Sequence, residues 1–260
     1  MKRNLNNVCI TGSGNGIGKA ISVLLNKHGY NVACVDINLE DAKNTINEFE
    51  NKVAKSIAIY ADISNVSHIK KMIKEVVCSF GSLHIMINNA GVTRTSDIMK
   101  LKEQDWYWIN NINSKGTFFC LQAAANQMKL QNSGGRIINM SSIGARGFVD
   151  VSNAIYAGSK GAILSLTKTA AQQLGKYNIN VNAICPSPTY TEIVKKLIKT
   201  RALEQNKSEN EIMKHYMRDV PLGRFNQPED IAELALFLSS ESSKNISGQS
   251  FNVDGGLIPS

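Results

Sequence analysis

The sequence is poor in the residues that build disulfide frameworks and metal centres. Its 260 residues include five cysteines and four histidines, and the histidines have no metal-ligand spacing. The cysteines are scattered, odd in number and form no Cys-x-x-Cys pair: Cys9, Cys34, Cys78, Cys120 and Cys185. This pattern excludes a disulfide framework and predicts reduced thiols, a cytoplasmic protein and no metal site.

Long apolar runs are also missing. No stretch reaches the ~18 apolar residues that a membrane-spanning helix needs. The start of the chain, Met1–Asn4, leads within a few residues into a strand-like run, and it lacks the apolar segment and cleavage site of a signal peptide. We therefore expect a cytoplasmic protein with no membrane partner.

Positive charge is in excess but is not concentrated. The net charge is +8, and the basic residues are spread along the chain in pairs such as Lys70-Lys71 and Lys195-Lys196. A nucleic-acid partner would favour a clustered basic face or an arginine-rich block. The distribution favours a solvated surface and no nucleic-acid partner, with nucleic-acid binding as the minor alternative.

Short β-rich runs alternate with longer helical patterns, and no linker or low-complexity tract divides the chain into domains. The strand-like runs are Asn7–Thr11, Asn31–Ile37, Ser56–Tyr60, Leu83–Asn88, Arg136–Met140, Asn180–Cys185 and Ser250–Val253. Helical spacing covers residues 17–28, 39–51, 66–79, 103–131, 153–175 and 228–239. This alternation predicts one α/β domain over residues 1–260, a parallel sheet with helices on both faces. Residues 187–220 are rich in Lys, Glu and Asn and interrupt this alternation of strands and helices. We predict that they form a helical insertion.

A glycine-rich turn follows the first predicted strand and opens a helix. It runs from Thr11 to Gly18, with glycines at alternate positions. Glycine lets a backbone turn tightly and approach a pyrophosphate, which then meets the N–H groups and positive end of the helix. The turn predicts nucleotide binding, and the alternative is a glycine-rich turn without a ligand.

Two aspartates lie at the end of the second predicted strand and just after the third. Asp36 ends the second strand, and its carboxylate can accept hydrogen bonds from adenosine ribose hydroxyls. It would repel a 2′-phosphate, so the sequence favours NAD over NADP; a solvent-facing turn residue is the alternative. Asp62 follows the third strand and is a candidate for the adenine amino group.

Tyr156 and Lys160 are four residues apart, so in a helix both side chains leave the same face. A tyrosine with its reference pKa of about 10 is a poor proton carrier at neutral pH. A neighbouring cation favours the phenolate, so we predict that Lys160 lowers the pKa of Tyr156. For the pair alone, the alternative is a packed tyrosine beside a solvent-facing lysine.

Several motifs, in this order, resemble those of the short-chain dehydrogenase/reductase family, and the resemblance covers nearly the whole chain. The matching segments are the glycine turn Thr11–Gly18, Asn88–Gly91 (NNAG), Asn113–Gly116, Ile137–Ser142, the Tyr156/Lys160 pair (YxxxK) and Val253–Gly256. The resemblance implies a Rossmann-type three-layer α/β/α sandwich with seven parallel strands. It also implies NAD(P)-dependent interconversion of an alcohol and a ketone.

The resemblance assigns roles to four residues. Tyr156 is the general acid or base, Lys160 lowers its pKa and holds the nicotinamide ribose, Ser142 polarises the substrate oxygen, and Asn113 kinks its helix and supports a water. Ser141 is the alternative to Ser142. Together, motifs and resemblance predict these cofactor-binding residues: Gly12, Ser13, Asn15, Gly16, Ile17, Asp36, Ile37, Asp62, Ile63, Asn89, Ala90, Gly91, Tyr156, Lys160, Pro186, Thr189 and Thr191.

The sequence departs from the family pattern at two places. Ser142 precedes Tyr156 by one residue more than is common, which predicts a slightly longer loop between them. After the sixth strand the family usually has Pro-Gly, whereas this chain has Pro186-Ser187. The missing glycine puts the backbone near the nicotinamide in question, while Thr189 and Thr191 still fit the carboxamide-binding positions.

We expect an NAD-dependent oxidoreductase acting on a secondary alcohol (polyol, sugar derivative, diol or hydroxy acid) or its ketone. The alternatives are a 3-oxoacyl-thioester reductase of the same family and, from another class, a non-catalytic dinucleotide-sensing protein. A nucleotide-sugar epimerase or dehydratase is disfavoured by the glycine spacing. Relatives commonly form homotetramers through two long helices and the C-terminal strand region, so we expect a homotetramer. The helices here are 103–131, with Trp106, Trp108, Phe118 and Phe119, and 153–175; the alternative is that these residues belong to the intramolecular core.

The substrate pocket is expected between the 187–220 insertion, as a lid, and the loop 143–155. Candidate wall residues on the loop are Arg146, Phe148 and Asp150. The lid cations are Lys195, Lys196, Lys199, Arg201, Lys207, Lys214 and Arg218. They either form a solvated lid surface or, for a few of them, face a phosphate or carboxylate on the substrate.

Overall fold

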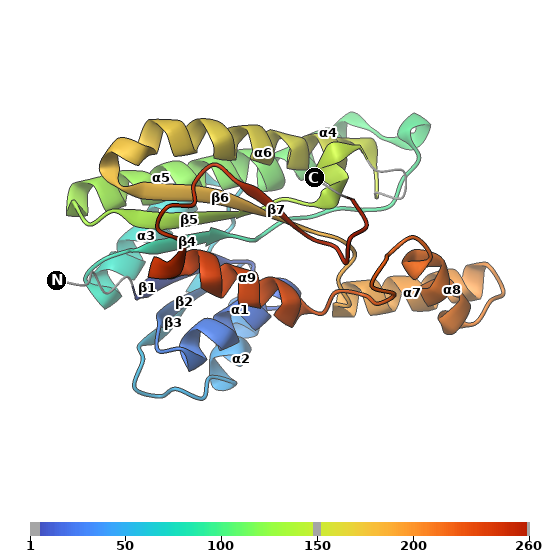
Figure 1. Cartoon of the computed structure of the whole chain (residues 1–260), viewed down its shortest axis with the longest axis horizontal. Coiled ribbons are helices and arrows are strands. Elements are labelled where there is room, and N and C mark those ends of the chain that lie inside the picture. The colour runs from blue at the N-terminus through green and yellow to red at the C-terminus, as the bar shows by residue number, and fades with distance from the viewer. Residues whose placement is uncertain (1–5, 148–151, 259–260) are drawn as a thin grey trace.

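The computed structural model describes residues 6–147 and 152–258, which form a seven-stranded parallel sheet with strand order β3-β2-β1-β4-β5-β6-β7 (Figure 1). The strands are β1 (Asn7–Thr11), β2 (Asn31–Asp36), β3 (Ser56–Tyr60), β4 (Ile85–Asn88), β5 (Gly135–Met140), β6 (Ile179–Pro186) and β7 (Ser250–Val253). The order reverses direction between β1 and β4. Such a switch point opens a crevice at the carboxyl ends of the strands.

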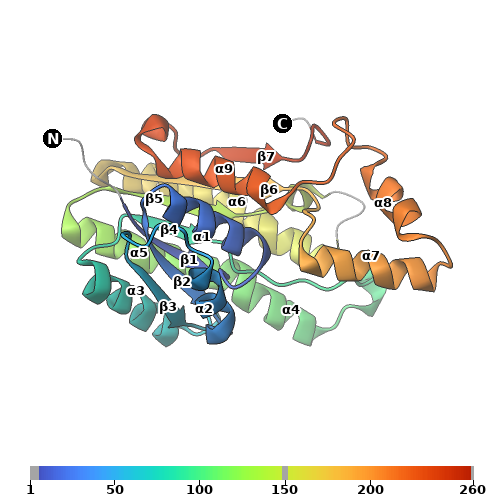
Figure 2. The same ribbon diagram turned by 90° about the horizontal axis from the view of Figure 1, so that it is seen from below.

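Helices cover both faces of the sheet (Figures 1 and 2). They are α1 (Gly16–Lys27), α2 (Leu39–Asn47), α3 (Val66–Phe80), α4 (Glu103–Asn110), α5 (Thr117–Gln131), α6 (Ala154–Leu174), α7 (Glu192–Glu204), α8 (Glu209–Met217) and α9 (Pro228–Ser239). One apolar core packs α3 and α5 on the sheet through residues such as Met72 and Cys120. The other packs α1 and α9 through residues such as Leu25 and Ile231. The predicted α/β/α sandwich is confirmed.

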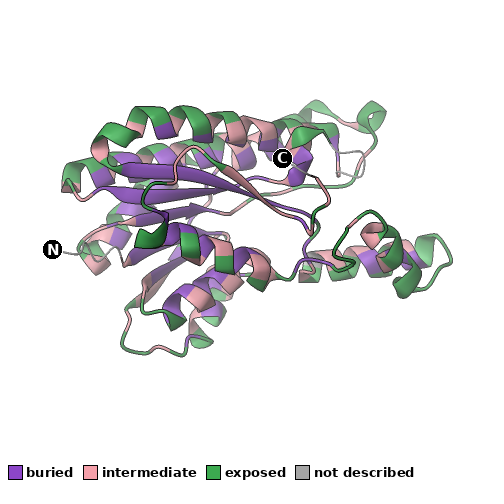
Figure 3. Ribbon diagram, viewed as in Figure 1, coloured by how far each residue is buried: buried purple, intermediate pink, exposed green. Residues whose placement is uncertain are grey.

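The central strands β1, β4, β5 and β6 are buried along their whole length, as Figure 3 shows for β5 and β6. Strands covered on both faces read as continuous apolar runs, which is why the sequence located them well. The predicted start of β4 was two residues early. Leu83 is held instead by Gln131, whose Oε1 accepts from the Leu83 N–H and whose Nε2 donates to the Leu83 carbonyl.

The long helix predicted over 103–131 is interrupted. A π-helical turn, Asn111–Gly116, separates α4 from α5. The Asn113 side chain lies in this turn and bonds to the Val92 backbone, accepting from its N–H at 2.8 Å and donating to its carbonyl at 2.9 Å. Such turns are common at functional sites. The helix disruption expected at Asn113 is therefore present.

The predicted insertion consists of α7 and α8, which extend away from the sheet (Figure 1, right). The pair has a small apolar core of its own: Ile198, Ala202, Ile212 and Phe225. Ser208 caps α8, since its hydroxyl accepts from the Glu211 N–H while the Glu211 carboxylate accepts from the Ser208 N–H. We call these two helices and the segment to Asp219 the lid.

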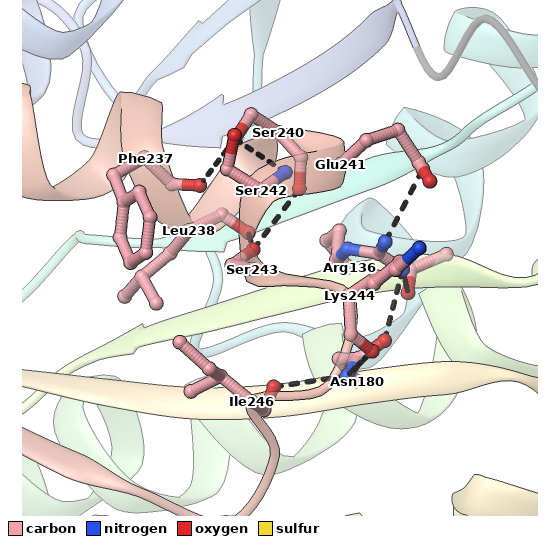
Figure 4. A network of polar contacts seen from close by, with 11 residues as sticks. Arg136, Asn180, Phe237, Leu238, Ser240, Glu241, Ser242, Ser243, Lys244 and Ile246 are labelled. Carbon is pink, nitrogen blue, oxygen red and sulfur yellow. Dashed lines mark hydrogen bonds and ion pairs between the residues drawn. The ribbon is translucent and has the colours of Figure 1, made fainter.

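A buried arginine links the amino ends of β5 and β6 through hydrogen bonds (Figure 4). Arg136, at the start of β5, donates to Asn180 on β6 at 2.9 Å and pairs with Glu241 at 3.3 Å. Asn180 in turn donates to the backbone carbonyls of Lys244 and Ile246. Burial lowers the pKa of Arg136. This network fixes the loop before β7 at the edge of the sheet opposite the crevice.

Candidate active site

A cavity of about 490 Å³ lies at the carboxyl ends of β4, β5 and β6, beneath the lid. Nine of the predicted site residues line it: Ile17, Asn89, Gly91, Ser142, Tyr156, Lys160, Pro186, Thr189 and Thr191. Asp36, Ile37, Asp62 and Ile63 lie outside it, on or just after β2 and β3. Residues from five separate segments of the chain therefore meet in one crevice.

The glycine turn can be built only from glycine at three points. Gly12 and Gly16 have positive φ angles of 64° and 52°. A Cβ at Gly12 would lie 2.8 Å from the Ala90 Cα, and a Cβ at Gly18 would lie 2.1 Å from the Gly12 carbonyl oxygen. The turn brings the start of α1 close to β4, and no acidic residue lies in the first turn of α1. This cradle suits a pyrophosphate.

Neighbouring side chains hold the turn in place. The Asn89 side chain donates to the carbonyls of Thr11 and Gly12 at 3.0 and 2.9 Å, and the Thr11 hydroxyl accepts from the Ala90 N–H. The buried Ser13 donates to the Val35 carbonyl. Asn89, Ala90 and Ser13, which were expected to bind the cofactor, therefore also position the glycine turn.

The Asp36 carboxylate is fixed at the end of β2. It accepts from the Gly14 N–H at 2.9 Å and from the Asn38 N–H at 3.0 Å. A second carboxylate, Asp41, accepts from the Asn15 side chain at 3.3 Å. Two negative groups thus flank Gly14 and Asn15, and Ile37 beside them is exposed. This region is suited to hydroxyl groups and unsuited to a further phosphate.

Asp62 and Ile63 follow β3. Asp62 accepts from the Ser64 N–H at 2.9 Å, which orients its carboxylate at the strand end. Ile63 is buried against the π-helical turn, where a Cβ on Gly116 would lie 2.9 Å from its Cδ1 atom. Ile63 therefore packs beneath the π-helical turn.

Tyr156 and Lys160 lie one turn apart on α6, as predicted. The Lys160 Nζ atom lies 5.8 Å from the centre of the Tyr156 ring and donates to the Met140 carbonyl at 2.8 Å. A Cβ on Gly91 would lie 3.2 Å from this Nζ and 3.3 Å from the Asn113 Oδ1. Lys160 and Asn113 thus converge on the glycine of the NNAG segment.

The pKa of Tyr156 corrects one prediction. Burial raises the pKa of Tyr156 above its usual value of 10, and the hydrogen bond with the Ser142 side chain acts in the opposite direction. Burial also lowers the pKa of Lys160 to about 8. A neighbouring cation alone would lower this pKa. In the folded chain the loss of solvent is the largest effect on the pKa of Tyr156, and it favours the protonated phenol.

The geometry separates Ser142 from Ser141. The buried Ser141 hydroxyl donates to the Lys160 carbonyl at 2.9 Å, whereas the Ser142 hydroxyl accepts from the Gly144 N–H and interacts with Tyr156. Ser142 is therefore the serine beside the phenol. Of the loop candidates, Arg146 is exposed and is not among the cavity-lining residues, and Phe148 and Asp150 lie outside the described residues.

Ser187, in place of the family glycine, is accommodated without strain, since it is not among the residues with positive φ. Its hydroxyl accepts from the Asn226 side chain at 3.1 Å, and its carbonyl accepts from the Thr189 hydroxyl at 3.0 Å. Thr191 lies across the glycine turn, where a Cβ on Gly16 would be 3.1 Å from its Cγ2 atom. The segment before α7 thus packs over the cofactor cradle.

Sequence reasoning missed several cavity residues. They are Val92, Thr93, Thr95, Trp108, Ser152, Val194, Leu197, His215, Tyr216, Asp219 and Leu257, among others. They come from loops, α4, the lid and the C-terminal segment, and no local spacing marks them. Trp108 was predicted for an oligomer contact, Arg201 as a lid cation and Ser141 as the alternative to Ser142. Several of the others fall within the predicted walls, the loop 143–155 and the insertion 187–220, but were not singled out.

Among the described residues, no group of three or more His, Cys, Asp or Glu side chains is arranged to hold a metal ion. Within the same residues, none of the helices combines the length and apolar character that crossing a bilayer requires.

Comparisons with known proteins identify the family of this chain. A family model described as enoyl-(acyl carrier protein) reductase matches residues 12–258. Solved structures with the same fold include a short-chain type dehydrogenase/reductase from Mycobacterium marinum and a levodione reductase. Their TM-scores are 0.89 and 0.90 and their identities 27% and 25%; they cover 98% and 96% of this chain, and the alignments span 96% of each. The chain belongs to the short-chain dehydrogenase/reductase family, a family of oxidoreductases that use a nicotinamide dinucleotide.

Two curated relatives carry names that state a specific reductase activity. The 3-oxoacyl-(acyl-carrier-protein) reductase FabG of Staphylococcus aureus is 39% identical over 253 residues, which is 95% of this chain and 96% of the relative. A diacetyl reductase ((S)-acetoin forming) of Staphylococcus epidermidis is 36% identical over 250 residues, which is 96% of this chain and 97% of the relative. Both are similar to this chain along nearly their whole length.

Proposed function

We propose that this protein is an NAD-dependent oxidoreductase that interconverts a secondary alcohol and its ketone, with Tyr156 as the general acid or base. One observation carries the proposal. Tyr156, Ser142 and Lys160 line one cavity, directly beside a glycine turn whose geometry excludes side chains. A proton donor, an oxygen-binding hydroxyl and a cofactor cradle are the groups that hydride transfer to a ketone requires.

The chain's own residues handle the proton and the substrate oxygen. A bound nicotinamide dinucleotide would supply the hydride. Tyr156, protonated at neutral pH, donates its proton to the substrate oxygen during reduction, while the Ser142 hydroxyl donates a second hydrogen bond to the same oxygen. Lys160 stabilises the phenolate that forms, and Asn113 holds the backbone beside Gly91 and the hydroxyl of Ser159.

The substitution Tyr156→Phe tests this mechanism. It removes the hydroxyl and keeps the ring that fills the cavity wall. We expect turnover of the best ketone to fall at least ~10³-fold because the proton donor is lost, at the upper part of the usual acid–base contribution. NADH binding, measured by fluorescence titration, should change little. Retained activity would refute the role of Tyr156.

Asp36 supports the preference for NAD over NADP. Its carboxylate is held by two backbone N–H groups, and a Cβ on Gly14 would lie within 3 Å of both Asp36 and Asp41, so a 2′-phosphate here would meet two negative charges. We expect kcat/KM with NADH to exceed that with NADPH by at least ~10-fold, a difference of about 1.4 kcal/mol. Equal or higher activity with NADPH would overturn this part of the proposal.

A second candidate is reduction of a 3-oxoacyl thioester. The 39% identity to a 3-oxoacyl-(acyl-carrier-protein) reductase favours it. A panel of acetoacetyl thioester, diacetyl, acetoin and simple diols, read by NADH absorbance, separates it from the main proposal. A kcat/KM that is highest for the thioester supports this second candidate, and one that is highest for a small ketone or diol supports the first.

We further propose a single-domain protein, residues 1–260, with the lid at about 187–220 closing over the substrate, located in the cytoplasm and assembled as a homotetramer. Exposed aromatic side chains on α4 and α5 support assembly: Trp106, Tyr107, Trp108 and Phe118. Phe119, predicted for the same face, instead packs against the intramolecular core.

A further inference from the structure

The lid supplies one wall of the cavity. Val194, Leu197 and Arg201 of α7 face it, as do His215, Tyr216 and Asp219 from α8 and the residues after it. Trp108 and Leu257 line other parts of the same space. The opposite wall carries Ser142 and Tyr156. A substrate whose carbonyl oxygen lies on Tyr156 would therefore extend its other end toward the lid.

The cavity divides the seven lid cations into two groups. Arg201 lines it, and the other six, all described by the structure, are not among its lining residues. Lys195 pairs with Glu192 at 2.6 Å and Arg218 with Asp219 at 2.8 Å. The remaining four are exposed: Lys196, Lys199, Lys207 and Lys214. Most of the positive charge of the lid therefore faces solvent.

The Arg201 guanidinium is held in place by a neutral partner. It donates to the Tyr216 hydroxyl and lies 5.3 Å from the centre of the same ring. Tyr216 packs near Phe225, in the small core of the lid. Within the described residues, no carboxylate lies at ion-pair distance from Arg201. Its charge is thus positioned by stacking and is not cancelled by an acid.

The charges around the cavity leave a positive balance. Among the lining residues that the structure describes, Arg201 and Lys160 are basic and Asp219 is the one carboxylic acid. The Asp219 carboxylate accepts from both the Nε and the Nη2 atoms of Arg218, so its charge is already compensated. A guanidinium with free N–H groups in a fork geometry matches a carboxylate or phosphate.

We propose that the substrate carries a carboxylate at the end away from the reacting carbonyl, and that Arg201 binds it. The inference rests on the proposed function, because Tyr156 and Ser142 define the other end of the substrate. The cavity volume lies in the usual range for small ligands, about 300–1,000 Å³. Together these features describe a short oxo acid and the hydroxy acid formed from it. A terminal phosphate would use the same N–H donors.

Matched substrates and matched variants test the proposal. The probes are 5-oxohexanoate, its uncharged methyl ester and a ketone of the same length ending in phosphate. Arg201→Gln removes the cation that lines the cavity, and Lys199→Gln removes an exposed cation on the same helix. We expect the wild-type protein to prefer the acid over the ester at least ~10-fold in kcat/KM, with the difference mainly in KM, as for loss of uniform binding.

In Arg201→Gln this acid-over-ester preference should fall at least ~10-fold, whereas Lys199→Gln should retain it, since one lost charged hydrogen bond is worth roughly this factor. Arg201→Lys, which keeps the charge without the fork, should lie between them. An equal loss for acid and ester would show that Arg201 only supports the lid, and would overturn the proposal. A stronger preference for the phosphate would replace carboxylate by phosphate.

A binding measurement keeps this test independent of catalysis. Hexanoate has the carboxylate but no ketone, and its affinity is read by the shift in thermal unfolding of the wild type and the two Gln variants. Binding lost in Arg201→Gln and kept in Lys199→Gln supports the proposal, and equal binding in both refutes it. If neutral ketones are reduced and acids are not, the inference fails while the proposed function stands. If no ketone is reduced with either cofactor, the proposed function fails.

Discussion

At the scale of single residues, the buried ammonium group of Lys160 destabilises the folded protein. Its ammonium is buried, and a single hydrogen bond to the Met140 carbonyl compensates it within the described structure. Burial lowers its pKa from 10.5 to about 8. The amine binds its proton more tightly in the unfolded chain than in the folded chain. At any pH where Lys160 is protonated, its burial therefore lowers the free energy of unfolding. Functional sites commonly contain such unfavourable charges.

We predict that Lys160→Met abolishes ketone reduction and stabilises the protein at pH 7. The free energy of unfolding should rise by roughly 1–3 kcal/mol, since each pKa unit corresponds to about 1.4 kcal/mol. The unfolded chain binds more protons than the folded chain between pH 8 and 10.5, so this contribution to wild-type stability improves as pH rises through that window. The advantage of the variant should therefore shrink by about half or more at pH 9.5.

Urea unfolding of both proteins at the two pH values provides the measurement. Lys168→Met, on the same helix but at an exposed position, is the matched control and should change stability by less than ~0.5 kcal/mol at either pH. A Lys160→Met variant less stable than wild type at pH 7 would contradict the prediction.

At the scale of elements, the amino end of α6, the helix that carries Tyr156, is tied to the loop after β4. Asn153 caps the helix, because its Oδ1 accepts from the Tyr156 N–H at 2.8 Å. Its Nδ2 donates to the Arg94 carbonyl and to the Thr93 hydroxyl. Thr93 lines the cavity. One side chain thus positions both the first turn that carries Tyr156 and a wall of the substrate site.

We predict that Asn153→Ala lowers the free energy of unfolding by about 1–2 kcal/mol, the usual cost of a lost helix cap. It should also lower kcat, because Tyr156 lies in the turn that the cap fixes. Asn153→Asp keeps the accepting oxygen and loses the donor to Arg94, so it should retain most of the stability while raising KM for the ketone. Urea unfolding and steady-state kinetics check both effects. If both variants changed the free energy of unfolding and the kinetic constants equally, the Oδ1 and Nδ2 atoms of Asn153 would not have separate roles.

At the scale of the whole molecule, the exposed aromatic residues of α4 bear on assembly. Trp106 and Tyr107 are each 56% exposed, an unusual exposure for large aromatic groups so close together. We predict a tetramer at micromolar concentration by light scattering, and dissociation on changing both residues to serine, since their burial would be lost. A monomer in the wild type would contradict this prediction.

The sequence alone determined the approximate strands, the class of fold and many of the residues that line the cavity. Buried parallel strands read as apolar runs, and the glycine turn, Asp36 and the Tyr156/Lys160 pair are marked by local spacing. Proximity along the chain was enough for these features, because each depends on neighbours within a few residues.

Only the tertiary structure decided the rest. The pKa of Tyr156 rises because of burial, which depends on packing from several elements and is invisible in a four-residue spacing. The interruption of the helix at Asn113 depends on Val92, a partner on another segment. The sequence did not indicate which of the seven lid cations would line the cavity. In the folded protein, Arg201 does so. Spacing identified the candidate reacting groups, and packing decided how deeply they are buried and what they face.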